Sequence, residues 1–266
     1  MNNLKHIKCF LLDMDGTVHL SGAALPGAAE AVARMRRQAK VIFVTNNTSV
    51  SRNSYVKKLC AIGIESTEKD IYTAGNATAD YLLSCHKGKK VYLLGTKDFK
   101  REFIDCGIQL TDTAPDLVVI GFDTELTYEK LVTTCNFIRG GVPYLATHPD
   151  VNCPAASGYI PDVGSFLSLI ERSTEKTPFI ICGKPFQPIA DGIKKLTGCK
   201  PREIAMIGDR LNTDIAFAQN NGFISVLVMT GATKTVAPDC MNKPDIVLQS
   251  IALWDSQTTS FSGIKV

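Results

Sequence analysis

The sequence predicts an α/β protein in which a doubly wound parallel sheet forms a Rossmann-like core and a second, α/β cap domain is inserted. Short apolar runs rich in β-branched residues alternate with helical segments along the whole chain. The runs are apolar without a polar alternation, which is typical of parallel strands covered on both faces by helices. A length of 266 residues with 45% hydrophobic residues allows one large domain or two smaller ones.

The first third of the chain sets the pattern. We expect strands at residues 8–13 and 41–45 and helices at 28–37 and 51–61. In the first helix, Ala28, Val32 and Met35 fall on one stripe, the spacing of a helix with one buried face. The elements therefore alternate from the start of the chain.

The same alternation continues to the end of the chain. Further strands are expected to begin at these residues: Val91, Asp116, Pro143, Phe179, Glu203, Phe223 and Asp245. Polar stretches at Cys85–Lys90 and Ser173–Pro178 are the best candidates for linkers. We therefore expect a core built from residues 1–84 and 179–266, with residues 85–178 forming the inserted cap.

Composition excludes several classes of protein. The 29 Lys and Arg residues nearly balance 26 Asp and Glu residues, so neither nucleic acid nor an anionic membrane is expected as a partner. No apolar run approaches the length of a membrane helix, and residues 1–8 lack the apolar stretch of a signal peptide. Nine cysteines without a CxxC pair argue against a disulfide framework or a zinc finger. A cytoplasmic location is expected.

The first chemical motif follows the first strand. It is Asp13-Met14-Asp15-Gly16. Alternate residues of an extended chain point the same way, so both carboxylates can face one point. Two such carboxylates repel each other unless a cation or a proton lies between them. A surface turn is the alternative interpretation, because Asp and Gly are common in turns.

Polar residues also close the next strand. Thr45-Asn46-Asn47-Thr48-Ser49 offers five hydrogen-bonding side chains just before a helix begins. Hydroxyl and amide donors together with a helix N-terminus suit a phosphate group. A polar loop that caps the helix is the alternative.

Two later strand ends carry charged residues. Lys184 follows the run at Phe179 and offers a compact positive charge that could lie beside a phosphoryl group. A solvated lysine in a turn is the alternative interpretation. Asp209 follows the run at Glu203, and Asp214 lies in the first turns of the next helix. Carboxylate oxygens are ligands that Mg²⁺ prefers, whereas Asp214 could instead serve the helix N-terminus.

Together these four segments resemble the signature motifs of the haloacid dehalogenase superfamily of phosphohydrolases, in the family's order. The stretches at Thr45–Ile64, Gly121–Leu131 and Ala146–Asp150 resemble the branch of NagD and the p-nitrophenyl phosphatases, whose α/β cap is inserted between the second and third motifs. The resemblance covers most of the chain and is specific for the branch but not for the substrate.

The resemblance implies a Mg²⁺-dependent phosphatase. Asp13 would be the nucleophile that forms an aspartyl-phosphate, and Asp15 the general acid and base. The ion would be held by the Asp13 carboxylate, the Asp15 backbone carbonyl and Asp209, with Asp214 orienting metal-bound water. The phosphoryl oxygens would be held by Thr45, Asn46 and Lys184, with Asn47 close to the substrate.

The resemblance also implies that the cap sets specificity. Its substrate loop would lie near Asn152 and Cys153, whose small side chains suggest modest discrimination among leaving groups. The expected substrates are small phosphorylated metabolites such as sugar phosphates or nucleoside monophosphates, with p-nitrophenyl phosphate as an artificial substrate. A homodimer is a mild expectation.

Two other functions stay open. One is a phosphotransferase on the same core, and the other is a regulatory protein that senses a phosphorylated ligand with little turnover. The loop residue His148 is taken as structural, and His6, His19 and His86 show no partner at a motif spacing.

Overall fold

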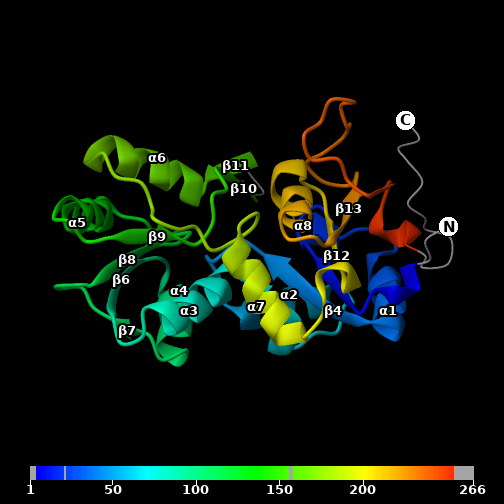
Figure 1. Cartoon of the computed structure of the whole chain (residues 1–266), viewed down its shortest axis with the longest axis horizontal. Coiled ribbons are helices and arrows are strands. Elements are labelled where there is room, and N and C mark those ends of the chain that lie inside the picture. The colour runs from blue at the N-terminus through cyan, green and yellow to red at the C-terminus, as the bar shows by residue number, and fades with distance from the viewer. Residues whose placement is uncertain (1–3, 21, 156–157, 255–266) are drawn as a thin grey trace. The chain divides into compact units, whose positions relative to one another are not determined.

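The computed structural model describes residues 4–20, 22–155 and 158–254 (Figure 1). The chain divides into two compact units. The first comprises Met1–Val44, Tyr55–Tyr72 and Ile193–Val266, and the second comprises Thr45–Ser54 and Thr73–Gly192. Within the described residues, no helix has both the length and the hydropathy needed to cross a bilayer.

A six-stranded sheet forms the centre of the first unit. The last residues of two of its strands, Thr45 and Thr73, belong to the second unit. Its strand order is β14 (Ile246–Leu248), β13 (Ile224–Val228), β12 (Ile204–Gly208), β1 (Cys9–Leu12), β4 (Lys40–Thr45) and β5 (Ile71–Thr73). Strand β1 pairs in parallel with β12 on one side and β4 on the other. All four residues of β1 are buried, as expected for a strand covered on both faces.

Helices connect these strands. They are α1 (Ala28–Gln38), α2 (Arg52–Ala61), the π-helical turn η4 (Leu211–Ile215) and α8 (Ala216–Asn220), and α7 (Gln187–Thr197) crosses from the second unit into the first. The predicted stripe of α1 is confirmed, since Ala28, Val32 and Met35 are all buried. A short hairpin joins β2 (His19–Leu20) to β3 (Ala23–Ala24) after β1.

Short single turns complete the first unit. They are η1 (Leu4–His6), η2 (Glu68–Asp70), η3 (Pro201–Glu203) and η5 (Ile251–Leu253). Directly after η5, the buried Trp254 packs edge-on against Phe10 of β1, with ring centroids 5.1 Å apart. The end of the described chain is thereby anchored to the central strand.

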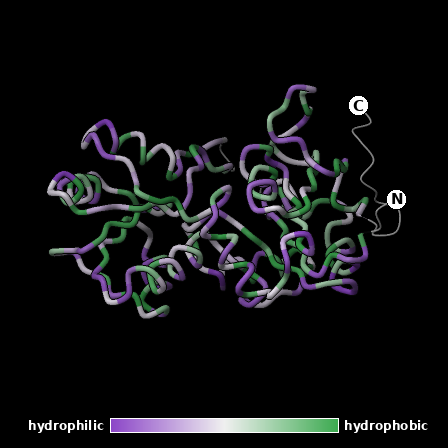
Figure 2. Tube along the Cα trace, in the orientation of Figure 1, coloured by the Kyte–Doolittle hydropathy of each residue, from purple (hydrophilic) through white to green (hydrophobic). Residues whose placement is uncertain are grey.

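A four-stranded sheet forms the centre of the second unit. Its order is β7 (Gln109–Leu110), β6 (Lys90–Leu94), β8 (Leu117–Ile120) and β9 (Tyr144–Ala146), with all three pairs parallel. The helices of this unit are α3 (Ala74–Cys85), α4 (Lys97–Asp105), α5 (Tyr128–Arg139) and α6 (Val163–Thr174), and the antiparallel hairpin is β10 (Asn152–Ala155) with β11 (Gly158–Pro161). Figure 2 shows hydrophobic residues along the strands of each unit.

The prediction of a regular strand beginning at Phe179 is wrong. The structure has only an isolated parallel bridge between Ala146 and Ile181. Backbone hydrogen bonds nevertheless hold residues 179–183 along β9, including Cys182 N–H to the Ala146 carbonyl at 3.0 Å. The run is short because Pro178 precedes it and Gly183-Lys184-Pro185 ends it, and proline lacks the N–H that a sheet ladder needs.

The remaining predicted strands are confirmed, and most of their ends differ from the observed ends by no more than one or two residues. One further difference lies after β12, where Asp214 occupies a π-helical turn before α8 begins. The predicted domain boundaries at residues 85 and 178 stay predictions, because compactness alone does not show where a domain was inserted.

Candidate active site

Three aspartates gather at the carboxyl ends of two neighbouring strands in the first unit. Because Leu12 of β1 pairs with Ile207 of β12, the residues that follow these strands lie side by side. The Asp13 N–H donates to the Ile207 carbonyl at 2.9 Å, which fixes the backbone at the strand end. One carboxylate oxygen from each of Asp13, Asp209 and Asp214 lies within 4.8 Å of the others.

The turn η4 brings Asp214 into this cluster. Its carboxylate accepts a hydrogen bond from the Arg210 N–H at 3.1 Å, and the side chain is 1% exposed. A Cβ added at Gly208 would lie 2.3 Å from the Asp214 Cγ, so only glycine allows this approach. Asp214 is therefore packed against the end of β12 and does not point into solvent.

A loop after β13 holds Asp209. The Ala232 N–H donates to Asp209 Oδ2 at 2.5 Å, and the Thr233 N–H donates to the Asp209 carbonyl at 3.1 Å. A Cβ added at Gly231 would lie only 1.9 Å from Asp209 Oδ2, and one added at Gly16 only 2.5 Å away. The two glycines thus leave the space that the carboxylate fills.

These three aspartates fit a hard divalent cation. Clustered carboxylates repel one another, and an ion such as Mg²⁺ relieves that repulsion through oxygen ligands. The fit is specific in shape as well as charge, because Gly208 and Gly231 make room for the two buried carboxylates. We call this set, Asp13, Asp209 and Asp214, the carboxylate cluster.

Asp15 stands outside the carboxylate cluster. Its side chain is 47% exposed, and its Oδ1 lies 3.2 Å from Nδ1 of the buried His19. The tight loop between them is closed by the Gly16 N–H, which donates to the His19 carbonyl at 2.7 Å, and Gly16 has a φ of 84° that favours glycine. His19 shows no partner at a motif spacing in the sequence, but in the structure its ring lies beside the Asp15 carboxylate.

The other predicted residues lie in the second unit. Lys184 is 1% exposed and Asn46 is 5% exposed, and the two are hydrogen-bonded to each other. The Asn47 N–H donates to the Thr45 hydroxyl at 3.1 Å. The polar stretch and the lysine are thus brought together, although Asn46 and Lys184 stand 138 positions apart in the sequence.

The predicted specificity loop lies in the hairpin of β10 and β11, which also contacts the polar stretch. The Asn47 amide donates to Cys153 Sγ at 3.6 Å, while Asn152 is exposed. The Ser49 hydroxyl donates to Asn47 Oδ1 at 2.7 Å and so turns the amide nitrogen of Asn47 toward Cys153. The structure therefore joins the side chains of Asn47 and Cys153 by a hydrogen bond.

Sequence reasoning missed Asp150. Its carboxylate accepts a hydrogen bond from the Asn46 amide at 3.1 Å, yet the two residues stand 104 positions apart and share no local signal. The buried His148 bonds Thr147 through Nδ1 and Asp162 through Nε2, both at 2.9 Å. Both ring nitrogens are thus engaged, which agrees with a structural role for His148.

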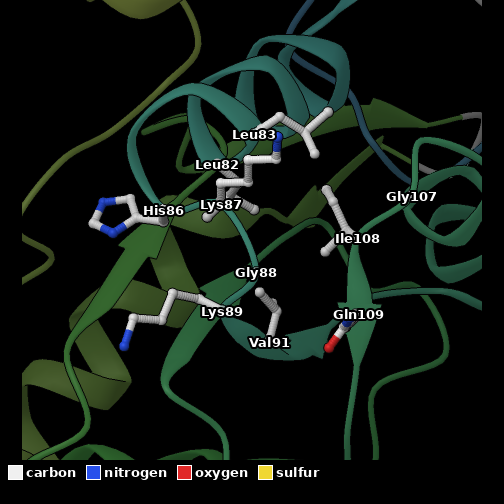
Figure 3. A pocket seen from close by; sticks show the side chains of 10 residues that line it. All are labelled: Leu82, Leu83, His86, Lys87, Gly88, Lys89, Val91, Gly107, Ile108 and Gln109. Atoms are coloured by element: carbon white, nitrogen blue, oxygen red, sulfur yellow. The ribbon is translucent and has the colours of Figure 1, made fainter.

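A pocket elsewhere in the second unit has no link to these residues. It lies between the end of α3 and strands β6 and β7 and is open to solvent. Figure 3 shows apolar side chains such as Leu82, Val91 and Ile108 along it, while His86 and Lys89 extend to the side away from Ile108. None of the predicted site residues lines it.

Comparisons with known proteins agree with the geometry. Residues 10–109 match the family model of haloacid dehalogenase-like hydrolases, and residues 181–254 match a HAD-hydrolase-like model. The 5'-nucleotidase YutF of Bacillus subtilis is 32% identical over 253 residues, which cover 94% of this chain and 98% of that protein.

Solved structures are similar over nearly the whole chain. The 4-nitrophenylphosphatase of Thermotoga maritima is 38% identical with a TM-score of 0.89, covering 95% of this chain and 97% of that one. NagD of E. coli K-12 is 27% identical with a TM-score of 0.85, covering 94% and 99%. The chain is therefore a phosphatase that belongs to the haloacid dehalogenase-like hydrolases, among the relatives of NagD and the p-nitrophenyl phosphatases.

Proposed function

We propose that this phosphatase is Mg²⁺-dependent and hydrolyses small phosphorylated metabolites through an aspartyl-phosphate on Asp13. The carboxylate cluster is the observation that carries the proposal. Of its three members, Asp209 and Asp214 are almost fully buried, whereas Asp13 is only partly buried. Asp13 is therefore the member best placed to meet a substrate.

Asp13 performs the first displacement. One of its carboxylate oxygens forms a bond to phosphorus while the bond from phosphorus to the ester oxygen breaks. Asp15 gives a proton to the departing oxygen, so that a neutral alcohol leaves. The hydrogen bond from the Asp13 N–H to Ile207 keeps the nucleophile at a fixed place during this step.

Asp15 then works in the opposite direction. It takes a proton from a water molecule, whose oxygen attacks the phosphorus of the aspartyl-phosphate. The bond between Asp13 and phosphorus breaks, inorganic phosphate leaves, and both carboxyl groups regain their starting state. The 3.2 Å contact of Asp15 with His19 supports this role, because it places the largely exposed carboxylate beside a buried ring nitrogen.

The carboxylates of Asp13 and Asp209 and the backbone carbonyl of Asp15 would hold Mg²⁺, and Asp214 would orient its water ligands. When bound, the ion lowers the repulsion between the anionic nucleophile and the anionic phosphate. Asp209 keeps its orientation through the hydrogen bond from Ala232, so this ligand is oriented before the ion arrives.

Residues of the second unit bind the phosphoryl group. Lys184 supplies a positive charge to its oxygens, and Thr45 and Asn47 supply hydrogen-bond donors. The expectation that the Asn46 side chain binds phosphate is revised below, because its hydrogen atoms are engaged elsewhere. The support for this group of residues is their assembly around Asn46 and Asn47 within one unit.

The substrate class is a small phosphate monoester. The name of the nucleotidase relative and the resemblance stated above favour nucleoside monophosphates and sugar phosphates. Asn152 and Cys153 would contact the leaving group and, being small, discriminate modestly among substrates. A cytoplasmic location and a homodimer remain part of the proposal.

Phosphate release from a panel of phosphorylated metabolites, measured with Mg²⁺ and with EDTA, tests the proposal. We expect release that depends on Mg²⁺ and is lost in Asp13→Asn, while thermal melting shows that this variant stays folded. Hydrolysis that is indifferent to EDTA would contradict the metal requirement. Transfer of phosphate to an added alcohol in place of water would favour a phosphotransferase, and binding without turnover would favour a regulatory protein.

A further inference from the structure

The side-chain amide of Asn46 has no hydrogen atom left for a ligand. Its Oδ1 accepts the Lys184 N–H at 2.8 Å, and its Nδ2 donates to the Lys184 carbonyl at 2.9 Å and to Asp150 Oδ2 at 3.1 Å. An amide nitrogen carries two hydrogens, and both are engaged here. Asn46 is therefore poorly suited to donate from its side chain to a phosphoryl oxygen.

The partners also fix which way the amide points. A backbone N–H can only donate, so the Lys184 N–H requires the amide oxygen. A backbone carbonyl and an ionised carboxylate can only accept, so the Lys184 carbonyl and Asp150 both require the amide nitrogen. An amide flipped by 180° would lose all three hydrogen bonds. Asp150 contributes a charged acceptor, which favours the observed orientation of the amide.

The bonds to the N–H and the carbonyl clamp the backbone of Lys184 at two points. The approach is close, since a Cβ added at Gly183 would lie 2.7 Å from Asn46 Oδ1 and 2.7 Å from the Thr147 carbonyl. Lys184 is also one of the largest fully buried side chains in the described part of the protein. A buried lysine side chain has little conformational freedom, so the position of its ammonium group depends on the position of its backbone.

Asp150 is itself anchored. Its carbonyl accepts the Gly164 N–H of α6 at 2.8 Å. A Cβ added at Gly164 would lie 2.3 Å from the Pro149 carbonyl, so the start of α6 fits tightly against this segment. The Asp150 carboxylate is therefore presented to Asn46 from a fixed backbone.

We infer that Asn46 is a positioning residue that holds Lys184 through its backbone, and that Asp150 holds Asn46 in the required orientation. The inference rests on the proposed function, in which Lys184 binds the phosphoryl group. It replaces the expected direct contact between the Asn46 side chain and phosphate. It also gives Asp150, a residue without a chemical role in the mechanism above, a part in phosphate binding.

A double-mutant cycle tests the inference. Binding of inorganic phosphate is measured by calorimetry in the presence of Mg²⁺ for Asn46→Ala, Lys184→Ala and the double variant, with Asn136→Ala as a control at an exposed asparagine of α5. We expect Asn46→Ala alone to weaken binding about tenfold or more, the scale of one or two lost hydrogen bonds, and Asn136→Ala to bind normally. In the Lys184→Ala background, Asn46→Ala should add less than about a twofold loss.

Asp150→Ala tests the second half of the inference. It should weaken phosphate binding in the same direction as Asn46→Ala, and combining the two should cost little more than Asn46→Ala alone. Thermal melting checks that each variant is folded. If Asn46→Ala does not fold, Asn46→Asp keeps the shape while it places an oxygen against the Lys184 carbonyl and Asp150, and it should show the same loss.

Each contrary result has a distinct meaning. Equal losses from Asn46→Ala with and without Lys184 would show a direct phosphate ligand and overturn the inference. Normal binding in Asp150→Ala would overturn the role of Asp150. Normal binding in Lys184→Ala would overturn the proposed function itself.

Discussion

The glycine at position 231 offers a sharp test of the carboxylate cluster. A methyl group placed there would lie 1.9 Å from Asp209 Oδ2 and 2.4 Å from its Cγ. Ordinary contacts between carbon and oxygen begin at about 3.2 Å, so the carboxylate or the loop must move by more than about 1 Å. Gly231→Ala therefore displaces a proposed metal ligand without changing any charge.

The expected loss follows from what that movement breaks. The Ala232 N–H donates to Asp209 Oδ2, and a hydrogen bond to a charged group contributes about 1.5–3 kcal/mol. Losing it corresponds to about a tenfold to hundredfold change in an equilibrium constant. We expect Gly231→Ala to weaken Mg²⁺ binding by such a factor, and to lower kcat at limiting more than at saturating Mg²⁺.

Calorimetric titration of the purified protein with Mg²⁺ measures the effect directly. Ala232→Gly is the matched control, because it alters the same loop but keeps the N–H that Asp209 uses. Its Mg²⁺ affinity should stay within about fivefold of wild type, since glycine costs at most about 1 kcal/mol of backbone freedom. Wild-type affinity in Gly231→Ala would refute the assignment of Asp209 as a ligand held by this loop.

Four further outcomes are expected. Asp13→Asn should abolish turnover of p-nitrophenyl phosphate with an unchanged melting temperature, and retention of most activity would count against the nucleophile. Asp15→Asn should slow turnover about a hundredfold or more and trap phosphoenzyme detectable by mass spectrometry, whereas an unchanged rate would exclude it as acid and base. Joint replacement of Asn152 and Cys153 by Ala should change the ratio of kcat/KM between a nucleotide and a sugar phosphate, and an unchanged ratio would remove them from the specificity loop. Burial raises the pKa of the Cys182 thiol from 9.0 to about 12, so this thiol ionises at lower pH in the unfolded chain and the free energy of unfolding falls as pH rises from 9 toward 12. In urea unfolding, Cys182→Ala should make this fall with pH less steep. An equally steep fall in the variant would contradict the prediction.

The sequence predicts the fold well because burial on both faces leaves a strong local trace. The runs that became β1, β8 and β12 are apolar throughout, and each of their residues is buried. The run at Phe179 carries the same trace but gives only a bridge. Hydropathy records burial and does not record whether a neighbouring strand is long enough for a ladder.

Some residues of the candidate site could also be predicted from the sequence, and others could not. Asp13 and Asp209 could be predicted to meet, because parallel strands that pair end at one edge of a sheet. Asp150 and the loop at Gly231 could not, because their contacts with Asn46 and Asp209 join distant segments that share no spacing rule. His19 left a faint signal, since it follows Asp15 by four residues.

The borders of the second sheet bear on how copies of this protein can associate. A sheet border with free N–H and carbonyl groups invites a strand from another chain. One border here is β7, which has only two residues, and the other, β9, is covered by residues 179–183. Strand addition at either border of this four-stranded sheet is thereby disfavoured.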